Sequence, residues 1–430
     1  MVAKYKIKER LIQKSKSPFV RSLGVYTLLN FFLRGISFLI TPLFTNYISP
    51  AEFGNLNLYL NSINFVLPIV SLGITNSISV DYFKFSKDEL SKHISSYLLF
   101  SFSISLALAF CIVIFGTQIG LYFKLALLYI IWIPILCFFN VCIDVIFVLY
   151  RNREMIKVVS IITFLRSISE LILSVLFIMY LLHGVQGRIW SLIFATTMLG
   201  IHSIYVLKND FGVRLHFDFT LIRKEILFWL SSMIGFLFVL SFSVLDKYIV
   251  KYYCRPDELG QYGLATQFGF IILTFTTAVS ASYLPNLYRD LSNQVSIIYI
   301  YKKVAWICGL VLSVALLSNF VVFLAYRYLI NERYATSWKL YIYVSIVYGL
   351  WSVITILYGF LTYYKMKSVF SILGLAAILF FIPLQIIGIQ SFQIIGLFWA
   401  QIGYFVVCII VILFIVRRHI FPMRFNNETC

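Results

Sequence analysis

Long apolar runs recur along the whole chain and are separated by short polar segments. Runs of about 20 residues cross the hydrocarbon core of a bilayer as α-helices, whereas the strands of a membrane barrel alternate apolar and polar residues. Because these runs are continuous, we expect an all-α polytopic membrane protein with about 12 transmembrane helices. The predicted spans are 22–47, 55–83, 93–115, 122–149, 157–181, 189–207, 225–251, 260–288, 303–326, 338–363, 368–389 and 394–416.

The composition supports a membrane protein and excludes a water-soluble one. Of the 430 residues, 61% are hydrophobic and only 12% are charged. A soluble fold of this length has too little interior to bury that much apolar surface. The longest internal loop, at 208–224, is too short for a separate soluble domain.

Basic residues lie mostly on one side of the predicted spans. Of the 35 Lys and Arg residues, 25 fall in the N-terminal tail and in alternate segments on its side, and six fall on the opposite side. Cytoplasmic loops carry the excess of Lys and Arg, so we expect both termini to be cytoplasmic. The net charge of +18 is then a topology signal, and we expect no nucleic-acid partner.

An internal repeat divides the chain into two halves. Pro50-Ala51-Glu52-Phe53-Gly54 recurs as Pro256-Asp257-Glu258-Leu259-Gly260, at an offset of 206 residues. Both copies fall in the outward loop after the first span of a six-span half, so the halves insert with the same orientation. We therefore expect two six-helix, parallel-topology repeats around a central cavity. The expected segments are a basic tail 1–21, an N-terminal half 22–207, a linker 208–224, a C-terminal half 225–416 and a tail 417–430.

Polar side chains follow one face of the first two helices in each half. An Arg near the centre of a span costs about 2.5–3.5 kcal/mol to insert, so Arg34 needs water, a carboxylate or an anionic ligand. We interpret it as a ligand in the cavity. Its helical face also carries Asn30, Ser37 and Thr41, the second span carries Asn57, Asn61 and Asn64, and the offset of 206 adds Lys247 and Gln267. The alternative for any one Asn, Ser or Thr is a hydrogen bond that joins neighbouring helices.

Ionisable residues elsewhere in the spans allow two interpretations. Arg166 and Glu170 are one helical turn apart, so they form either a local structural pair or a site for substrate or ions. Asp246, Glu170 and Asp144 are the candidates for ion coupling. Movement of the side-chain amine towards the interface explains Lys247 only in part.

The remaining motifs point away from catalysis. The seven cysteines form no CxxC pair or Cys/His cluster, and the chain has no GxxxxGK[ST] motif. We therefore expect neither a metal nor a cofactor, and no ATP hydrolysis.

Two segments resemble the Wzx-type polysaccharide flippases of the multidrug/oligosaccharidyl-lipid/polysaccharide exporter superfamily. Residues 41–60, TPLFTNYISPAEFGNLNLYL, match the family's proline followed by an sP-x-eFG loop, and residues 246–262, DKYIVKYYCRPDELGQY, match its later e-LG-Y loop. The family has Arg where this chain has Lys247, which keeps the charge but loses bidentate binding of phosphate. Through its twelve-span plan the resemblance covers nearly the whole chain.

The resemblance implies a flippase in the bacterial inner membrane. Its substrate would be an undecaprenyl-diphosphate-linked oligosaccharide repeat unit, of O-antigen or a similar surface polysaccharide, moved from the cytoplasmic to the periplasmic leaflet. It also implies a polysaccharide polymerase and a chain-length regulator as partners. Arg34, Arg166 and Lys247 are the cations for the diphosphate. A drug/cation antiporter of the same superfamily is the first alternative; a membrane polysaccharide polymerase is the second, although the outward loops are short.

Overall fold

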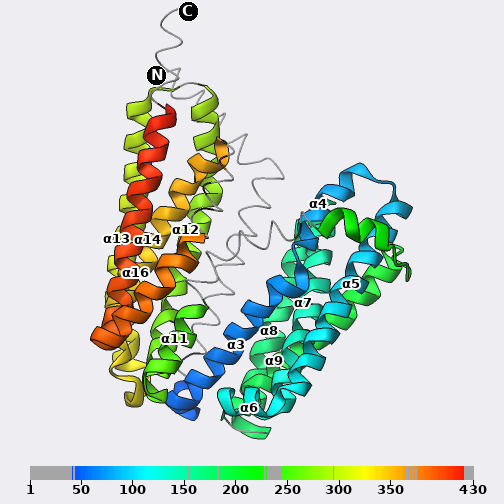
Figure 1. Ribbon diagram of the computed structural model, residues 1–430, viewed down its shortest axis with the longest axis horizontal. Coiled ribbons are helices and arrows are strands. Elements are labelled where there is room, and N and C mark those ends of the chain that lie inside the picture. Colours follow the sequence, from blue (N-terminus) through cyan, green and yellow to red (C-terminus); the bar gives the residue numbers. More distant parts are fainter. Residues whose placement is uncertain are drawn as a thin grey trace, which may run out of the picture. The chain divides into compact units, whose positions relative to one another are not determined.

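The computed structural model describes residues 41, 44–153, 155–181, 184–226, 229, 244–293, 295–364, 366, 369, 372 and 375–420. Within these residues every regular element is helical, with short π- and 3-10 segments between longer α-helices. The chain forms two compact units (Figure 1). Unit 1 includes Ile69–Phe115 and Ile131–Leu227, and unit 2 includes Thr41–Pro68, Gly116–Ile130 and Phe228–Cys430.

Unit 1 is a bundle of antiparallel helices. Ser86 and Glu89 cap the start of α5 reciprocally, which is the capping-box arrangement. The first turn of α9 lies close to the start of η1, because a Cβ built on Gly187 would lie 2.6 Å from the Phe177 carbonyl oxygen. The elements are α4 (Ile74–Lys84), α5 (Lys87–Ile114), α7 (Leu127–Asn152, whose first turn belongs to unit 2), α8 (Ile156–Leu176), η1 (Phe177–Leu181) and α9 (Gly184–Asn209).

Unit 2 is organised around helix α14, which packs against α12, α13 and α16. Serine and glycine on α14 allow this close packing: Ser352 accepts a hydrogen bond from Thr276 of α12 at 2.7 Å, and Gly349 faces Ala315 of α13. The elements are α3 (Pro50–Ser71, whose last turn belongs to unit 1), α6 (Gly116–Phe123), α11 (Leu245–Tyr253), α12 (Pro256–Ser292), α13 (Ile297–Tyr328), η2 (Glu332–Tyr334), α14 (Ser337–Tyr363), η3 (Ala377–Phe381) and α16 (Ile382–Ile420).

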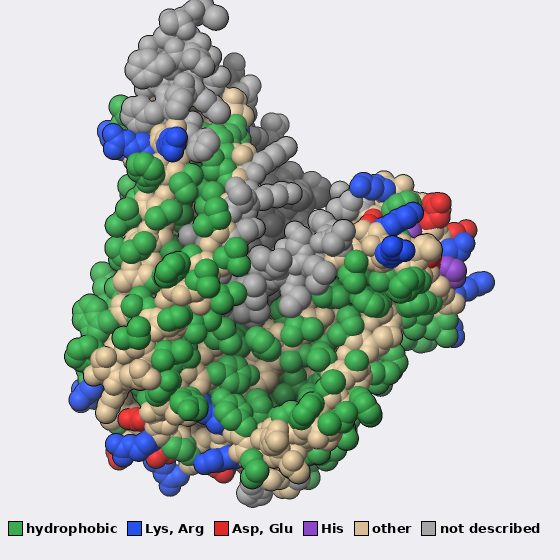
Figure 2. All heavy atoms as spheres, in the orientation of Figure 1, with side chains coloured by type: hydrophobic (Ala, Val, Ile, Leu, Met, Phe, Trp, Pro, Cys, Tyr) green, Lys and Arg blue, Asp and Glu red, His purple; other side chains and the backbone are tan. Residues whose placement is uncertain are grey.

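The lengths and compositions of the helices fit a bilayer. Eight helices in the described part of the chain are long and apolar enough to cross a membrane, or up to nine if the pair α3 and α4 is one broken span. Hydrophobic side chains cover the flanks of both units, and charged side chains gather at the ends of the helices (Figure 2). The predicted class, an all-α polytopic membrane protein, is confirmed.

The second predicted span differs from the sequence-based expectation of one continuous helix at 55–83. Helix α3 ends at Ser71 and α4 begins at Ile74, because Leu72 and Gly73 adopt left-handed conformations with φ of 45° and 76°. Glycine reaches this conformation without steric penalty, and it lies directly beside the strained leucine. The break comes one turn after Pro68, which lies inside α3.

The two repeat motifs form the first turns of α3 and α12. Proline occupies the first helical position in both, where its missing N–H has no partner to lose. The Glu two residues later accepts a hydrogen bond from the backbone N–H of the residue before the proline, at 3.0 Å from Ser49 to Glu52 and at 2.8 Å from Arg255 to Glu258. The recurring P-x-E pattern is thus a helix start.

The glycine that ends each repeat motif permits close contact between these two helix starts. A Cβ built on Gly54 would lie 3.0 Å from the backbone nitrogen of Gly260, and one built on Gly260 would overlap the Pro50 carbonyl oxygen. Both contacts lie within unit 2. Each repeat motif therefore caps its helix, and its glycine lets the starts of α3 and α12 touch through backbone atoms.

Helix α16 reverses direction at Phe392 and Gln393, whose backbone angles are not helical. Gly388 and Gly396 lie face to face across this turn, and a Cβ on either would overlap the other's carbonyl oxygen. The apolar segment Ala377–Arg418 therefore supplies two spans, in agreement with the separate spans predicted at 368–389 and 394–416.

We expect Gly388→Ala to destabilise this hairpin. The added methyl group must push the two arms apart, and overpacking of this kind costs about 1–3 kcal/mol. Gly403→Ala is the matched control on the same helix, because a Cβ there meets nothing within 4 Å. The melting temperature of the purified protein in detergent should fall for the first variant only; equal melting temperatures would show that the hairpin is not as tight as described.

Candidate functional site

Unit 1 contains an ion pair between α8 and α9. Glu170 accepts a hydrogen bond from the Arg188 guanidinium at 2.6 Å, and a second guanidinium nitrogen of Arg188 donates to the Ser174 hydroxyl, also at 2.6 Å. Ser174 in turn shares a hydrogen bond of 2.9 Å with Ser191. The side chains of Glu170 and Arg188 are 26% and 15% exposed, so most of this pair is buried inside unit 1.

Arg166 lies one turn before Glu170 on α8 but has a different partner. Its guanidinium donates to the amide oxygen of Asn140 on α7 at 2.7 Å. Asp144 follows Asn140 by one turn on the same helix, and the charges of Arg166 and Arg151 act on it. In the described part of the chain Arg166 makes no other hydrogen bond, so most of its guanidinium donors are free to bind an anion.

Arg188 is the partner of Glu170 that the sequence did not reveal. The span predicted at 189–207 leaves Arg188 in an outward loop, whereas α9 begins at Gly184. The local pair of Arg166 with Glu170 that their spacing allowed is not formed. Glycines at 184 and 187 let α9 start before residue 189 and close to the end of α8. This start brings Arg188 to the Glu170 carboxylate.

Unit 2 buries a second charged pair at the start of α11. Asp246 and Lys247 are each 2% exposed, and the Lys247 amine lies 3.4 Å from the Asp246 carboxylate. Tyr262 of α12 donates to the other carboxylate oxygen at 2.5 Å. Burying two charges is costly unless they are paired and hydrogen-bonded, and both conditions are met. The sequence-based explanation that Lys247 partly reaches for the interface is wrong, since its amine is enclosed.

The polar stripe on α3 is only partly exposed. Asn57 and Asn61 are buried, and each amide donates to a backbone carbonyl one turn earlier, at 3.1 and 2.6 Å. Asn57 also packs on Gly263 of α12. Asn64 is exposed. This geometry favours helix packing for Asn57 and Asn61 and leaves Asn64 accessible.

Gln267 and Thr41 meet within unit 2, where the amide nitrogen of Gln267 donates to the Thr41 hydroxyl at 3.1 Å. The sequence placed Thr41 on the polar face of the first span and Gln267 on that of the eighth. Asn30, Arg34 and Ser37, the other members of the Thr41 face, lie outside the described residues.

Gln385 on α16 is a polar residue that the pattern did not single out. It is fully buried, and neither atom of its amide group has a hydrogen-bond partner in the residues that the structure describes. A buried amide without partners needs water or a ligand. Its signal in the sequence is a single polar residue in an apolar run, which is easily read as a helix contact.

No group of three or more His, Cys, Asp or Glu side chains in the described residues could hold a metal ion. A family model for polysaccharide biosynthesis proteins matches residues 19–289, well over half of the chain. The chain belongs to the polysaccharide biosynthesis protein family. No curated relative matches it at a significant level.

Two solved structures show the fold of this family member. The lipid II flippase MurJ in an inward closed conformation is 18% identical over 91% of this chain and 87% of its own, with a TM-score of 0.74. An inward-facing multidrug resistance MATE family transporter of the MOP superfamily is 12% identical over 91% of this chain and 95% of its own, with a TM-score of 0.71. The fold is therefore that of membrane transporters and flippases rather than of an enzyme, as the sequence predicts.

Proposed function

We propose that this polysaccharide biosynthesis protein is a flippase for undecaprenyl-diphosphate-linked oligosaccharide repeat units. It moves them from the cytoplasmic to the periplasmic leaflet of the bacterial inner membrane by alternating access. Family membership supports a role in polysaccharide synthesis, and the fold supports transport across a bilayer. The repeat unit belongs to O-antigen or a similar surface polysaccharide. After transport, a polymerase and a chain-length regulator would receive it.

The observation that carries the proposal is the guanidinium of Arg166, which forms no ion pair among the described residues. Asn140 fixes one of its nitrogens at 2.7 Å and leaves the others available within the apolar part of unit 1. A diphosphate needs such a donor, because guanidinium groups bind phosphate oxygens bidentately. Lys247 is a weaker candidate, because its charge is already balanced by Asp246. Arg34 stays a predicted ligand of the same kind.

Export of an anion out of the cell is favoured by a potential that is negative inside, by about 2.3 kcal/mol per charge per 100 mV. Any additional coupling to protons or sodium ions requires a carboxylate that changes its partners. Asp246 fits best, since its two oxygens bind a cation and a tyrosine hydroxyl that would both be released on protonation. Glu170 and Asp144 are the other candidates.

The alternative of a drug/cation antiporter rests on the similarity in fold to MATE transporters. A cationic drug needs a carboxylate without a cation partner. Glu170 and Asp246 are each paired with a basic side chain. Asp144 forms no ion pair among the described residues, but the charge of Arg166 acts on it. A basic side chain therefore acts on each of these three carboxylates, which favours an anionic substrate.

Arg166→Ala is expected to lower export of surface polysaccharide by about 10- to 150-fold, the effect of losing a charged hydrogen bond of about 1.5–3 kcal/mol. Arg166→Lys should retain part of the activity. The assay is surface polysaccharide in a complemented null strain, normalised to the amount of protein in the membrane. Arg223→Ala is the control, because this arginine is exposed and lies far from Arg166 in the sequence. Normal export by Arg166→Ala would remove the residue from the mechanism.

The orientation that we propose places Glu52, Asp257 and Glu332 in the periplasm and Lys87, Arg153, Lys208 and Lys365 in the cytoplasm. Single cysteines at these positions, in a background without the native seven, are probed in intact spheroplasts with an impermeant maleimide. Only the first three positions should react. Labelling at 153 or 208 would overturn the orientation.

A further inference from the structure

Unit 1 has a cavity of about 620 Å³ between α5, α7, α9 and the segment that follows α9. Its walls are mostly apolar and include Leu98, Phe102 and Phe138, with the last two rings 5.0 Å apart. Lys208 and Arg214 line the same cavity. None of the residues of the two charged pairs lines it, so it is a separate feature of the molecule.

The segment after α9 is fixed against the start of α5. Three serines of α5 hold it: Ser91 donates to the Gly212 carbonyl at 2.8 Å, Ser95 accepts from the His216 N–H at 2.8 Å, and Ser96 accepts from the Asp218 N–H at 3.1 Å. Hydrogen bonds from Thr220 and Leu221 hold the Asp218 carboxylate and lower its pKa, the Thr220 hydroxyl having the largest effect. Arg214 is therefore carried by an ordered segment.

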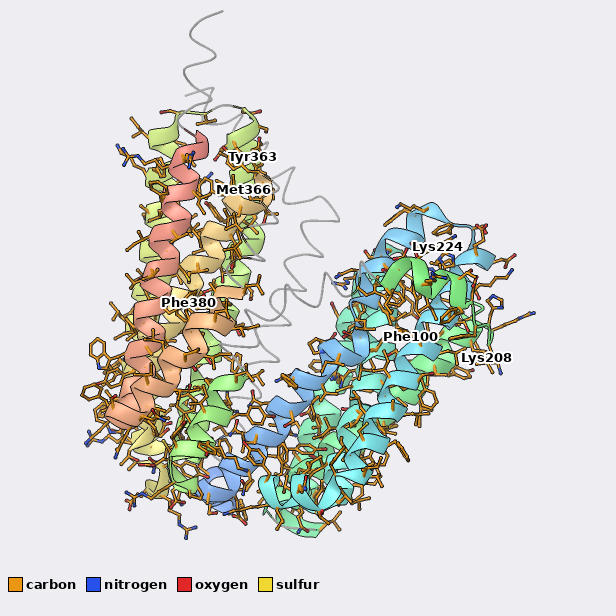
Figure 3. The ribbon with its side chains drawn as sticks, viewed as in Figure 1. Phe100, Lys208, Lys224, Tyr363, Met366 and Phe380 are labelled. Carbon is orange, nitrogen blue, oxygen red and sulfur yellow. The ribbon has the colours of Figure 1, made fainter. Side chains whose placement is uncertain are left out.

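The two basic side chains of the cavity are exposed and have no ion pair among the residues described here. Lys208 lies towards the same end of unit 1 as Lys224 (Figure 3). Beside Arg214, the apolar side chains of Leu215, Phe217 and Phe219 are 89%, 52% and 67% exposed. Free cations next to exposed apolar side chains are typical of the headgroup level of a bilayer.

We propose that this cavity binds an anionic phospholipid of the surrounding bilayer. One acyl chain lies along the apolar walls of α5 and α7, and the phosphate binds between Lys208 and Arg214. Basic pockets between membrane helices bind anionic headgroups in this way. The site is lined by none of the residues of the two charged pairs, and it joins three helices of unit 1 to the linker.

Size and position favour a phospholipid over the transported lipid. A volume of about 620 Å³ is in the range of pockets for one small ligand, about 300–1,000 Å³, and a long polyprenyl chain exceeds it. The serine contacts hold the segment that carries Arg214, and Lys208 belongs to the last turn of α9. Both cations therefore stay at one end of the unit, whereas a transported diphosphate must leave that level.

Binding is measured by native mass spectrometry of the purified protein with added phosphatidylglycerol or phosphatidylcholine. We expect selective retention of phosphatidylglycerol. The double variant Lys208→Gln/Arg214→Gln should weaken it about 30-fold, because each basic side chain near a membrane surface contributes about 1 kcal/mol. Leu98→Trp, which fills the cavity and leaves its charges, should weaken retention as well. Lys87→Gln/Lys224→Gln, two basic residues that do not line the cavity, is the matched control.

Three outcomes would overturn the proposal. Equal retention of phosphatidylcholine would show that the phosphate charge is not recognised. An equal loss in the control variant would show non-specific attraction to a basic surface. Displacement of phosphatidylglycerol by an equimolar undecaprenyl-diphosphate-linked oligosaccharide would assign the cavity to the transported lipid instead. The measurement does not depend on transport, so it is separate from the test of the flippase.

Discussion

Arg188→Gln should lower the stability of the protein by about 3–5 kcal/mol, because it leaves the Glu170 carboxylate unpaired between two helices. The wild-type guanidinium binds that carboxylate at 2.6 Å and also holds Ser174. Removing both charges leaves no unpaired ion, so Glu170→Gln/Arg188→Gln should recover most of the loss. Thermal unfolding in detergent measures both effects.

The control for this cycle is Arg151→Gln, which removes an exposed arginine at the end of α7. It should leave the melting temperature within experimental scatter, since exposed charges contribute little. If Arg188→Gln were as stable as the wild type, Glu170 would have another source of stabilisation and the pair would not organise α8 and α9.

Gly260→Val is expected to prevent α12 from packing on α3. A Cβ at this position overlaps the Pro50 carbonyl oxygen, and backbone atoms cannot rotate away as side chains do. The effect should exceed the usual 1–3 kcal/mol of overpacking, so little protein should reach the membrane or it should export no polysaccharide. Gly54→Ala should be milder, because its closest contact is 3.0 Å.

Gly309→Val serves as the control, because a Cβ at Gly309 on α13 meets nothing within 4 Å. Both the amount of protein in the membrane and the export per molecule are measured. Normal export by Gly260→Val would mean that transport does not require the close contact between the starts of α3 and α12.

The sequence predicted the class of the fold well because hydrophobic length is a local property. The span predicted at 338–363 agrees with α14 at Ser337–Tyr363. The repeat motifs, expected in outward loops, instead form the first turns of α3 and α12. Their proline and Glu are a helix-start signal that acts within one turn.

The partners of the charged residues were harder to predict, because they depend on which faces of neighbouring helices meet and on where each helix begins. Glu170 has a basic residue one turn away on its own helix, yet it pairs with Arg188 of the next long helix. Lys247 adjoins an acid in the sequence, yet only the fold shows that both are buried and that Tyr262 completes the site. A periodic stripe of Asn residues likewise does not distinguish a packed face from an open one.

The central claim is that the protein moves an anionic lipid-linked saccharide between leaflets. The direct test is purified protein in liposomes that contain undecaprenyl-diphosphate-linked oligosaccharide, with an impermeant enzyme that cleaves only the exposed sugar. Wild type and Arg223→Ala should make the protected inner-leaflet pool accessible, and Arg166→Ala should do so at least about tenfold more slowly. An inner pool that stays as protected with the wild-type protein as in protein-free liposomes would contradict the claim.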